Sequence, residues 1–312
     1  MSHNSLVSVL MPAYNAERYI LAAIDSIRNQ THQNWELLIL NDGSTDSTGT
    51  ILKTLNDSRI KVFNETKNQG YLSSCNHLFD LAKGDFITFQ DADDTCVSNR
   101  LEICLGQFEK RPELDFITSN FTRSSSDLKE QTEHISLVDF TKYAKDPSYQ
   151  PIVCCATLFV RKKILELVGG YHPFFTDIGG EDYHWLFNLS RGGEGKHIDA
   201  VLYNYRQHEA QSHALNTNPL KYYFFDIQTE LRASVIDNQI DLLDSDSELK
   251  KRWVLHIEAN STDLLFREAS SMLNRNEPNK SIRLAFKALS NKPFSLTSWH
   301  RFAYLVYSNT MR

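Results

Sequence analysis

Residues 86–94 read Phe-Ile-Thr-Phe-Gln-Asp-Ala-Asp-Asp, an apolar run that ends in three carboxylates. This pattern predicts a β-strand over Phe86–Phe89, with Asp91 and Asp93 at its exposed end. Mg²⁺ and Mn²⁺ bind carboxylate oxygens together with the phosphates of a substrate. The stretch therefore predicts a site for a metal ion and a nucleotide diphosphate. An acidic loop before a helix that starts near Ser98 would give a similar pattern, and this alternative stays open here.

Short β-rich runs alternate with apolar residues at helical spacing on both sides of this strand. Such alternation predicts an α/β fold, a Rossmann-like, mostly parallel sheet flanked by helices. The predicted strands are Leu6–Met11, Glu36–Leu40, Ile60–Phe63, Phe86–Phe89 and Phe116–Thr118, and the predicted helices are Glu17–Asn29, Asp46–Leu55, Tyr71–Ala82 and Asn99–Lys110.

Three polar clusters follow predicted strands, at the edge of the sheet where ligands of such folds bind. They are Pro12–Asn15, Asn41–Asp46 and Gln90–Asp94. Because the carboxyl ends of parallel strands meet at one edge, we expect these clusters to converge on one crevice.

The chain changes character in its second half. Residues 120–150 are polar and lack periodicity, which predicts a loop excursion. Regular patterns then resume with strands at Ile152–Val160 and His197–Tyr205, helices at Lys162–Val168 and Asp182–Ser190, and helical segments at Tyr222–Ile236, Leu249–Leu273 and Ile282–Leu289. We predict one α/β domain over residues 1–215 and a helical C-terminal region over residues 216–312.

The composition excludes several classes of protein. With 312 residues, 41% of them hydrophobic and 23% charged, the chain is an ordinary globular protein with a full core. Its net charge of -6 argues against a nucleic-acid binder. Five cysteines without paired spacing indicate free thiols rather than disulfides or a zinc site. No leader-like pattern is present, and no apolar run approaches the roughly 18 residues of a membrane span, so we expect a cytoplasmic protein.

Five ordered motifs over residues 12–182 resemble those of the family 2 glycosyltransferases of the GT-A fold. They are Pro12-Ala13-Tyr14-Asn15, Asn41–Asp46, Asn68-Gln69-Gly70, Asp91–Asp94 and Gly180-Glu181-Asp182. The resemblance implies an inverting hexosyl- or N-acetylhexosaminyltransferase that uses Mn²⁺ or Mg²⁺. It moves a sugar from a nucleotide sugar, most often a UDP-sugar, to an acceptor hydroxyl. The implied acceptor is a saccharide or a lipid-linked saccharide, as in bacterial surface polysaccharide or lipopolysaccharide assembly.

The resemblance also implies which residues bind the nucleotide. Tyr14 would stack on the base, Asp42 would accept the ring N–H of uracil, and Asp91 would face the ribose or assist the metal. A core position for Tyr14 and a turn role for Asp42 are the structural alternatives. The family carries an Arg where Cys75 stands, so a guanidinium contact to the base is not expected. The remaining implied nucleotide-binding residues are Pro12, Asn15, Gly70, Asn76 and Ala92.

For the reaction itself, the resemblance implies that Asp93 and His208 hold the metal ion, which neutralises charge on the leaving diphosphate. Asp182 would be the general base that takes the proton of the acceptor hydroxyl. Acidic residues at a helix start also complement the helix dipole, so this structural role remains an alternative. Secondary candidates for acceptor or diphosphate contacts are Glu181, Trp185 and Arg206, with core packing as the alternative for Trp185.

Two other classes of function share an Asp-x-Asp site. A nucleotidyltransferase or a hydrolase of nucleotide sugars would use the same metal chemistry, but no Walker loop or Gly-x-Gly-x-x-Gly is present. A non-catalytic binding protein with a transferase-like domain is the other alternative. Such a protein would first lose its carboxylates, yet Asp91, Asp93 and Asp182 are all in place.

The C-terminal tail mixes basic and aromatic residues. Between Asn276 and Arg312 there are six basic residues and one acidic residue, Glu277. One interpretation is an amphipathic segment on an anionic bilayer, which would place the protein at the inner face of the membrane. The other is packing against the α/β domain or a second subunit in a homo-oligomer.

Overall fold

The computed structural model describes residues 5–129, 131–208, 211, 218–274, 277–291 and 295–310. The chain forms two compact units. The first comprises Met1–Asn216 and Gln228–Gln239, and the second comprises Thr217–Ile227 and Ile240–Arg312. The first segment ends close to the predicted boundary, but residues 228–239 group with the first unit rather than with the tail.

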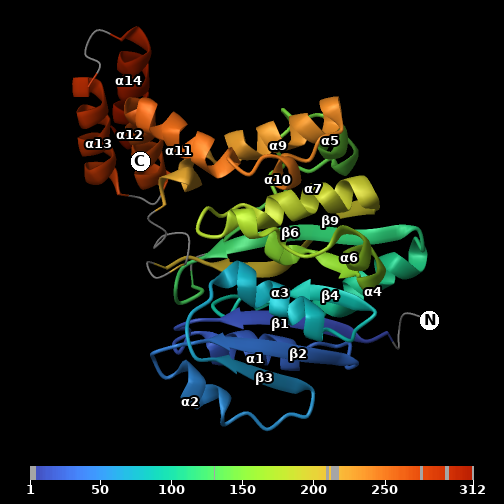
Figure 1. Ribbon diagram of the computed structural model, residues 1–312. Coiled ribbons are helices and arrows are strands. Elements are labelled where there is room, and N and C mark those ends of the chain that lie inside the picture. The colour runs from blue at the N-terminus through green and yellow to red at the C-terminus, as the bar shows by residue number, and fades with distance from the viewer. Residues whose placement is uncertain are drawn as a thin grey trace. The chain divides into compact units, whose positions relative to one another are not determined.

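The N-terminal strands of the first unit form a parallel sheet in the order β3-β2-β1-β4 (Figure 1). Every residue of β1 and β2 is buried, as expected for strands that are covered on both faces. The sequence predicts all four strands from short runs rich in apolar residues. Their bounds are β1 Val7–Ala13, β2 Trp35–Asp42, β3 Ile60–Glu65 and β4 Phe86–Phe89.

The sheet continues beyond β4 in the order β8-β6-β9-β5, with β7 paired to β6. β6 and β9 are parallel, whereas β8 runs antiparallel to both β4 and β6. β8 follows a 3-10 turn at Cys155–Thr157. The predicted α/β fold is confirmed, and the antiparallel pairings of β5, β7 and β8 are local departures from the parallel pattern. The bounds are β5 Thr95–Cys96, β6 Leu114–Ser124, β7 Gln131–His134, β8 Phe159–Arg161 and β9 Glu194–Arg206.

Helices cover this sheet, and α1 shows why they form. Its buried residues are Ile20, Ala23, Ile24 and Ile27, the spacing that places apolar side chains on one helix face. The bounds are α1 Ile20–Arg28, α2 Thr48–Leu52, α3 Tyr71–Leu81, α4 Arg100–Lys110, α5 Phe140–Lys145, α6 Lys162–Val168 and α7 Glu181–Gly192.

The segment 120–150 is more regular than predicted. It contains the end of β6, the strand β7 and the helix α5, where the sequence predicts a loop. α5 is only six residues long and is capped by Asp139, whose carboxylate accepts the N–H of Lys142. A helix this short has too few turns to show periodicity, which explains the missed element.

Arg232 explains why residues 228–239 belong to the first unit. Its side chain is fully buried. The guanidinium donates to the carbonyls of Pro147 and Tyr149, at 2.6 and 2.9 Å, and lies 4.4 Å from the ring centroid of Tyr143. Three groups of the first unit therefore hold this part of α9 (Phe224–Asn238).

The second unit is helical, and its core contains Phe266, Ala269, Leu273, Ala285, Ala288 and Leu305. The predicted helix Leu249–Leu273 is two helices, which meet at Asn260. In the part of the chain that the structure describes, none of the helices is long and apolar enough to span a bilayer. The bounds are α10 Leu242–Ser245, α11 Leu249–Ala259, α12 Ser261–Asn274, α13 Pro278–Asn291 and α14 Leu296–Thr310.

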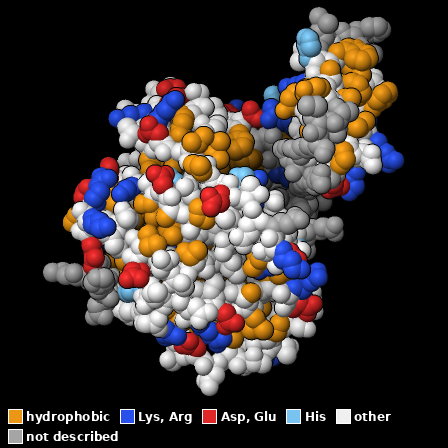
Figure 2. All heavy atoms as spheres, turned by 180° about the vertical axis from the view of Figure 1, so that it is seen from behind, with side chains coloured by type: hydrophobic (Ala, Val, Ile, Leu, Met, Phe, Trp, Pro, Cys, Tyr) orange, Lys and Arg blue, Asp and Glu red, His pale blue; other side chains and the backbone are white. Residues whose placement is uncertain are grey.

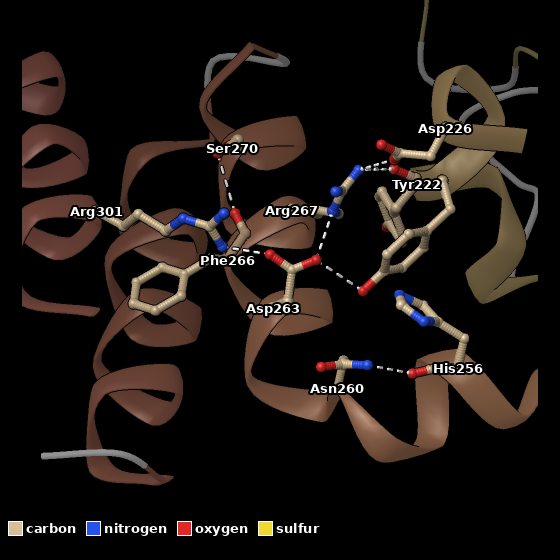
Figure 3. A network of polar contacts seen from close by, with 10 residues as sticks. Tyr222, Asp226, His256, Asn260, Asp263, Phe266, Arg267, Ser270 and Arg301 are labelled. Atoms are coloured by element: carbon tan, nitrogen blue, oxygen red, sulfur yellow. Dashed lines mark hydrogen bonds and ion pairs between the residues drawn. The ribbon is translucent and has the colours of Figure 1, made fainter. Parts of the chain in front are cut away.

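A polar network centred on Asp263 joins the helices of this unit (Figure 3). Its carboxylate accepts from Tyr223 Oη at 3.0 Å, from Arg267 Nε at 2.7 Å and from Arg301. Arg267 also pairs with Asp226 at 2.5 Å. Burial acts to raise the pKa of Asp263, but the hydrogen bonds from Arg301 and Arg267 outweigh it and hold the pKa below its usual value. The network therefore carries an ionised Asp263.

We predict that Arg232→Met lowers the free energy of unfolding by at least about 2 kcal/mol, because two buried carbonyls lose their donor. Urea denaturation followed by circular dichroism measures the change. Arg191→Met is the matched control, since Arg191 is exposed and also contacts Phe187. We expect the control to change stability by less than about 0.5 kcal/mol. Equal effects of the two variants would contradict the structural role of Arg232.

Candidate functional site

The acidic loop after β4 is clamped by residues of β9. The N–H of Asp91 donates to Tyr203 Oη at 3.0 Å, and the N–H of Arg206 donates to Asp94 Oδ1 at 2.7 Å. Arg206 Nε also donates to the carbonyl of Asp93 at 2.6 Å. These contacts join segments more than 100 residues apart in the sequence. Arg206 is therefore a residue that positions the acidic loop, and its predicted diphosphate contact stays a prediction.

Asp93 and His208 lie side by side, as the family resemblance implies for metal ligands. His208 Nε2 is 2.9 Å from Asp93 Oδ2. The imidazole is held by Tyr19, whose ring centroid lies 4.7 Å away, and the guanidinium of Arg206 lies over the same Tyr19 ring. The ring of Tyr19 thus contacts both Arg206, at the end of β9, and His208, two residues later. The sequence analysis missed Tyr19, although it lies five positions after Tyr14 in the same polar segment.

Asp91 is the second carboxylate of the loop. Burial, together with the negative charge of Asp93, raises the pKa of Asp91 to about 7. The hydroxyl of Tyr71 donates to Asp91 Oδ1 at 3.3 Å and acts in the opposite direction. The positive charge of Arg100 lowers the pKa of Asp91 but does not offset the rise, and a divalent cation would supply further positive charge.

The donor set fits Mg²⁺ or Mn²⁺ with a bound substrate. Asp93 offers a carboxylate oxygen and His208 an imidazole nitrogen, while Asp91 lies in the same loop. In the described part of the chain, no group of three or more His, Cys, Asp or Glu side chains is arranged to hold a metal ion. Such ions commonly take one or two protein ligands and complete their shell with substrate phosphates and water.

Asp42 connects the end of β2 to the turn before α3. Its carboxylate accepts the N–H groups of Gln69 and Gly70, at 2.7 and 2.9 Å, and the residue is 3% exposed. Gly43 has a φ of +66°, and a Cβ there would lie 2.6 Å from the backbone of Lys67, so the turn requires glycine. The turn role of Asp42 accounts for these contacts. Its contact with uracil stays a prediction.

Tyr14 and Asn15 end β1 beside the second cluster. Asn15 Oδ1 accepts the N–H of Thr45 at 2.8 Å, and the N–H of Asn15 donates to Ser44 Oγ at 3.0 Å. These bonds bring the first and second clusters together, as expected from their places at strand ends. Tyr14 itself is 46% exposed, which leaves its ring free of the core. Pro12 and Ala92 are buried, so only their backbone could contribute to a nucleotide site.

Asn76 and Trp185 have structural partners. Asn76 Nδ2 donates to the carbonyl of Tyr171, and Asn76 Oδ1 accepts the N–H of the same residue, both at 2.8 Å. Trp185 is 1% exposed, and its indole N–H donates to the carbonyl of Gly169. The expectation that Trp185 offers a ring face to a sugar is therefore corrected, because that ring packs in the core against Phe79 and Tyr171.

Glu181 and Asp182 form the first turn of α7. Burial, together with the charge of Asp182, raises the pKa of Glu181 to about 8, and burial also raises the pKa of Asp182. The N–H of Tyr183 and the thiol of Cys155 hydrogen-bond to Asp182 and oppose this rise in its pKa. Both carboxyl groups of this pair therefore release their protons at a higher pH than a free carboxyl group does. Raised carboxyl pKa values are typical of acid–base sites.

The acidic pair lies near the acidic loop. The charge of Asp182 contributes to the raised pKa of Asp91, so the two groups lie within electrostatic range. Tyr71 and Cys155, which contact these carboxyl groups, are further residues that the sequence analysis missed. Tyr71 directly follows a recognised motif, whereas no sequence signal identifies Cys155.

The sequence signature of Glycosyl transferase family 2 matches residues 8–169. A UDP-Glc:alpha-D-GlcNAc-diphosphoundecaprenol beta-1,3-glucosyltransferase of Escherichia coli is 39% identical over 184 residues, which are 58% of this chain and 68% of that protein. Chondroitin synthase of Escherichia coli is 28% identical over 240 residues, 76% of this chain and 33% of the synthase.

Solved structures of low sequence identity share the fold. TarS of S. aureus, residues 1–349 in complex with UDP, has a TM-score of 0.55 at 15% identity, covering 97% of this chain and 89% of that one. A mannosyltransferase from Pyrobaculum calidifontis in complex with GDP-Man and Mn²⁺ has a TM-score of 0.54 at 17% identity, covering 98% of this chain and 86% of that one.

We predict that Asp42→Ala lowers the free energy of unfolding by about 2 kcal/mol, because two backbone N–H groups lose a charged acceptor. Urea denaturation measures this loss. Asp25→Ala, on the exposed side of α1, is the control and should change stability by less than about 0.5 kcal/mol. If Asp42→Ala kept the stability of the unsubstituted protein, the turn role assigned to its carboxylate would be wrong.

Proposed function

Because the chain belongs to glycosyl transferase family 2, we propose that it is an inverting, metal-dependent transferase that moves a sugar from a UDP-sugar to an acceptor hydroxyl. The observation that carries this proposal is the meeting of two acidic groups at one edge of the sheet. The loop with Asp91 and Asp93 supplies ligands for a metal ion and a diphosphate. The pair Glu181 and Asp182 supplies a base. Family membership favours transfer over the nucleotidyltransferase and hydrolase alternatives.

Three observations support a uridine nucleotide as the donor. Tyr14 is exposed beside the clusters at the ends of β1 and β2, where its ring can stack on a base. The Escherichia coli relative is named for UDP-Glc, and TarS has been solved with UDP and with UDP-GlcNAc. We therefore propose a hexosyl or an N-acetylhexosaminyl group as the sugar transferred.

Asp93 and His208 are the residues that would hold Mn²⁺ or Mg²⁺. When bound, such an ion neutralises the negative charge that develops on the leaving nucleoside diphosphate. The contact between Asp93 and His208 would be exchanged for contacts to the ion, while Arg206 and Tyr203 keep the loop in place. The mannosyltransferase solved with Mn²⁺ is consistent with such a site.

Asp182 would accept the proton of the acceptor hydroxyl. The hydroxyl oxygen forms a bond to the anomeric carbon, and the bond between that carbon and the diphosphate oxygen breaks. The proton passes to the Asp182 carboxylate, and the electron pair of the broken bond leaves with the nucleoside diphosphate. Glu181, whose pKa is raised to about 8 by burial and the charge of Asp182, can in its protonated form donate a hydrogen bond to a second acceptor oxygen.

The acceptor we propose is a lipid-linked saccharide. The Escherichia coli relative is named for an acceptor sugar attached to diphosphoundecaprenol. A chain of this kind would act in the assembly of a bacterial surface polysaccharide or lipopolysaccharide, on the cytoplasmic side of the membrane.

The second unit supports contact with an anionic bilayer. On α13 and α14, aromatic side chains are exposed, and Figure 2 shows hydrophobic and basic side chains together on this unit. Such a surface inserts rings at the level of the lipid headgroups and attracts their negative charge. The exposed aromatic residues are Phe286, Trp299, Tyr304 and Tyr307, and the exposed basic residues are Lys280, Arg283, Lys287 and Arg301.

We predict that two aspartate variants fail at different steps. Asp182→Asn should bind UDP and Mn²⁺ as tightly as the unsubstituted protein but lose at least about 100-fold in transfer, because only proton removal is affected. Asp93→Ala should lose the metal-dependent part of UDP binding. Calorimetry measures binding, and release of UDP from UDP-sugars in the presence of lipid-linked acceptors measures transfer.

Asp80→Asn, an exposed aspartate on α3, is the control for both variants and should leave binding and transfer unchanged. Full transfer by Asp182→Asn would require a different base. Metal-dependent UDP binding by Asp93→Ala would require a different ligand for the ion.

We predict that the double variant Trp299→Ser, Tyr304→Ser partitions at least about tenfold less onto phosphatidylglycerol vesicles, because two rings leave the interface. Cosedimentation with the vesicles measures partitioning. Leu167→Ser, which removes an exposed apolar side chain of α6 in the first unit, should partition like the unsubstituted protein. Unchanged partitioning of the double variant would exclude this surface as the membrane contact.

A further inference from the structure

Gln228 of α9 contacts Gly180, the residue directly before α7. Its side chain is 1% exposed, and Nε2 donates to the carbonyl of Gly180 at 2.8 Å. The same carbonyl accepts the N–H of His184 at 3.1 Å, the first hydrogen bond of α7. Figure 1 shows α9 lying along α7. Gln228 therefore bonds to the group that sets the first turn of α7, which carries Glu181 and Asp182.

The start of α7 has no side-chain cap. Gly179 and Gly180 both have positive φ, at 85° and 86°, and Gly180 has no side chain to cap the helix. Glycine residues of this kind leave the chain free to change direction. A hydrogen bond from outside the helix is thus a means of fixing its first turn.

The part of α9 that carries Gln228 is itself held firmly. Arg232, one turn later, donates to the carbonyls of Pro147 and Tyr149, and Gln150 Nε2 donates to Thr229 Oγ1 at 2.9 Å. Functional groups are held most accurately by side chains that stand on rigid elements. Gln228 stands on such an element.

One feature of Gln228 is unfavourable for stability alone. Among the residues that the structure describes, its buried Oε1 has no hydrogen-bond partner. A buried oxygen without a partner is costly, and an apolar side chain of similar size would avoid this cost. The amide is therefore better explained by the N–H it provides to Gly180.

We propose that Gln228 is a positioning residue for the general base. This inference rests on the proposed function, in which Asp182 takes the proton of the acceptor hydroxyl. By holding Gly180, the Gln228 amide fixes the first turn of α7 and so the direction of the Asp182 carboxylate. The residue lies outside the segment 8–169 that the family signature matches. Loss of the amide should reduce the rate of transfer while donor binding is kept, because a misdirected base weakens only the chemical step.

Gln228→Met tests this proposal, because methionine has a similar size and no N–H donor. We expect kcat to fall at least about tenfold, with the donor KM and the affinity for UDP within about twofold of the unsubstituted protein. Hydrogen exchange of the peptide 181–187 should speed up at least about tenfold, since the N–H of His184 donates to the carbonyl that Gln228 holds. Gln228→Leu, which also lacks an N–H donor, is the second variant if Gln228→Met does not fold.

Gln150→Met is the matched control. It removes an amide that also holds α9, through Thr229, but it leaves the bond to Gly180 in place. We expect its kcat and its exchange at residues 181–187 to stay within about twofold of the unsubstituted protein. An unchanged kcat in a folded Gln228 variant would overturn the proposal, and so would equal losses in the Gln228 and Gln150 variants.

Hydrogen exchange also separates this inference from the proposed function. If the unsubstituted protein transferred no sugar, the proposed function would fail on its own. Slow exchange in Gln228→Met would still show that Gln228 does not fix the first turn of α7. Faster exchange confined to residues 181–187 would support that role.

Discussion

Several carboxyl groups lie close together at the carboxyl edge of the sheet in the first unit, where they repel one another when ionised. Asp94 is buried and Asp91 is half-buried beside Asp93, and the pKa values of Asp91 and Asp94 rise through loss of contact with water and through the charge of Asp93. Glu181 and Asp182 add a second acidic pair within electrostatic range. Such a cluster is unfavourable unless other contacts hold it and a cation neutralises it. The hydrogen bonds around the cluster hold it in place, and the proposed metal ion would neutralise its charge.

The contacts that hold the cluster come from distant parts of the sequence. Arg206 and Tyr203 of β9 fix the backbone of the acidic loop, and Tyr19 packs on the imidazole of His208. Asp42 fixes the turn before α3 through two backbone N–H groups. These hydrogen bonds hold carboxyl groups close together although their repulsion makes the arrangement unfavourable for stability. Such an arrangement is typical of a functional site.

The sequence predicts the parallel half of the sheet well, because β1, β2 and β4 are continuous apolar runs that end in polar clusters. It also predicts that Asp91, Asp93 and the pair at residues 181–182 belong to one site, and the structure brings them together. It does not predict α5, which is too short to show a period, and the strand it predicts at Ile152–Val160 is a 3-10 turn at Cys155–Thr157 followed by the short strand β8. Trp185 shows a further limit, because a tryptophan on a helix has the same sequence pattern whether it faces the core or a ligand. Contacts such as Gln228 with Gly180 depend on tertiary packing, which one sequence does not reveal.

We propose that the loop of Asp91 and Asp93, with His208, binds a divalent ion together with a nucleoside diphosphate. Calorimetric titration of the purified chain with UDP, once with Mn²⁺ and once with a chelator, measures this binding, and CDP and GDP serve as controls. We expect UDP to bind only with Mn²⁺ and more strongly than CDP or GDP. Equal binding of UDP with the chelator, or no binding of any of the three nucleotides, would rule out such a site.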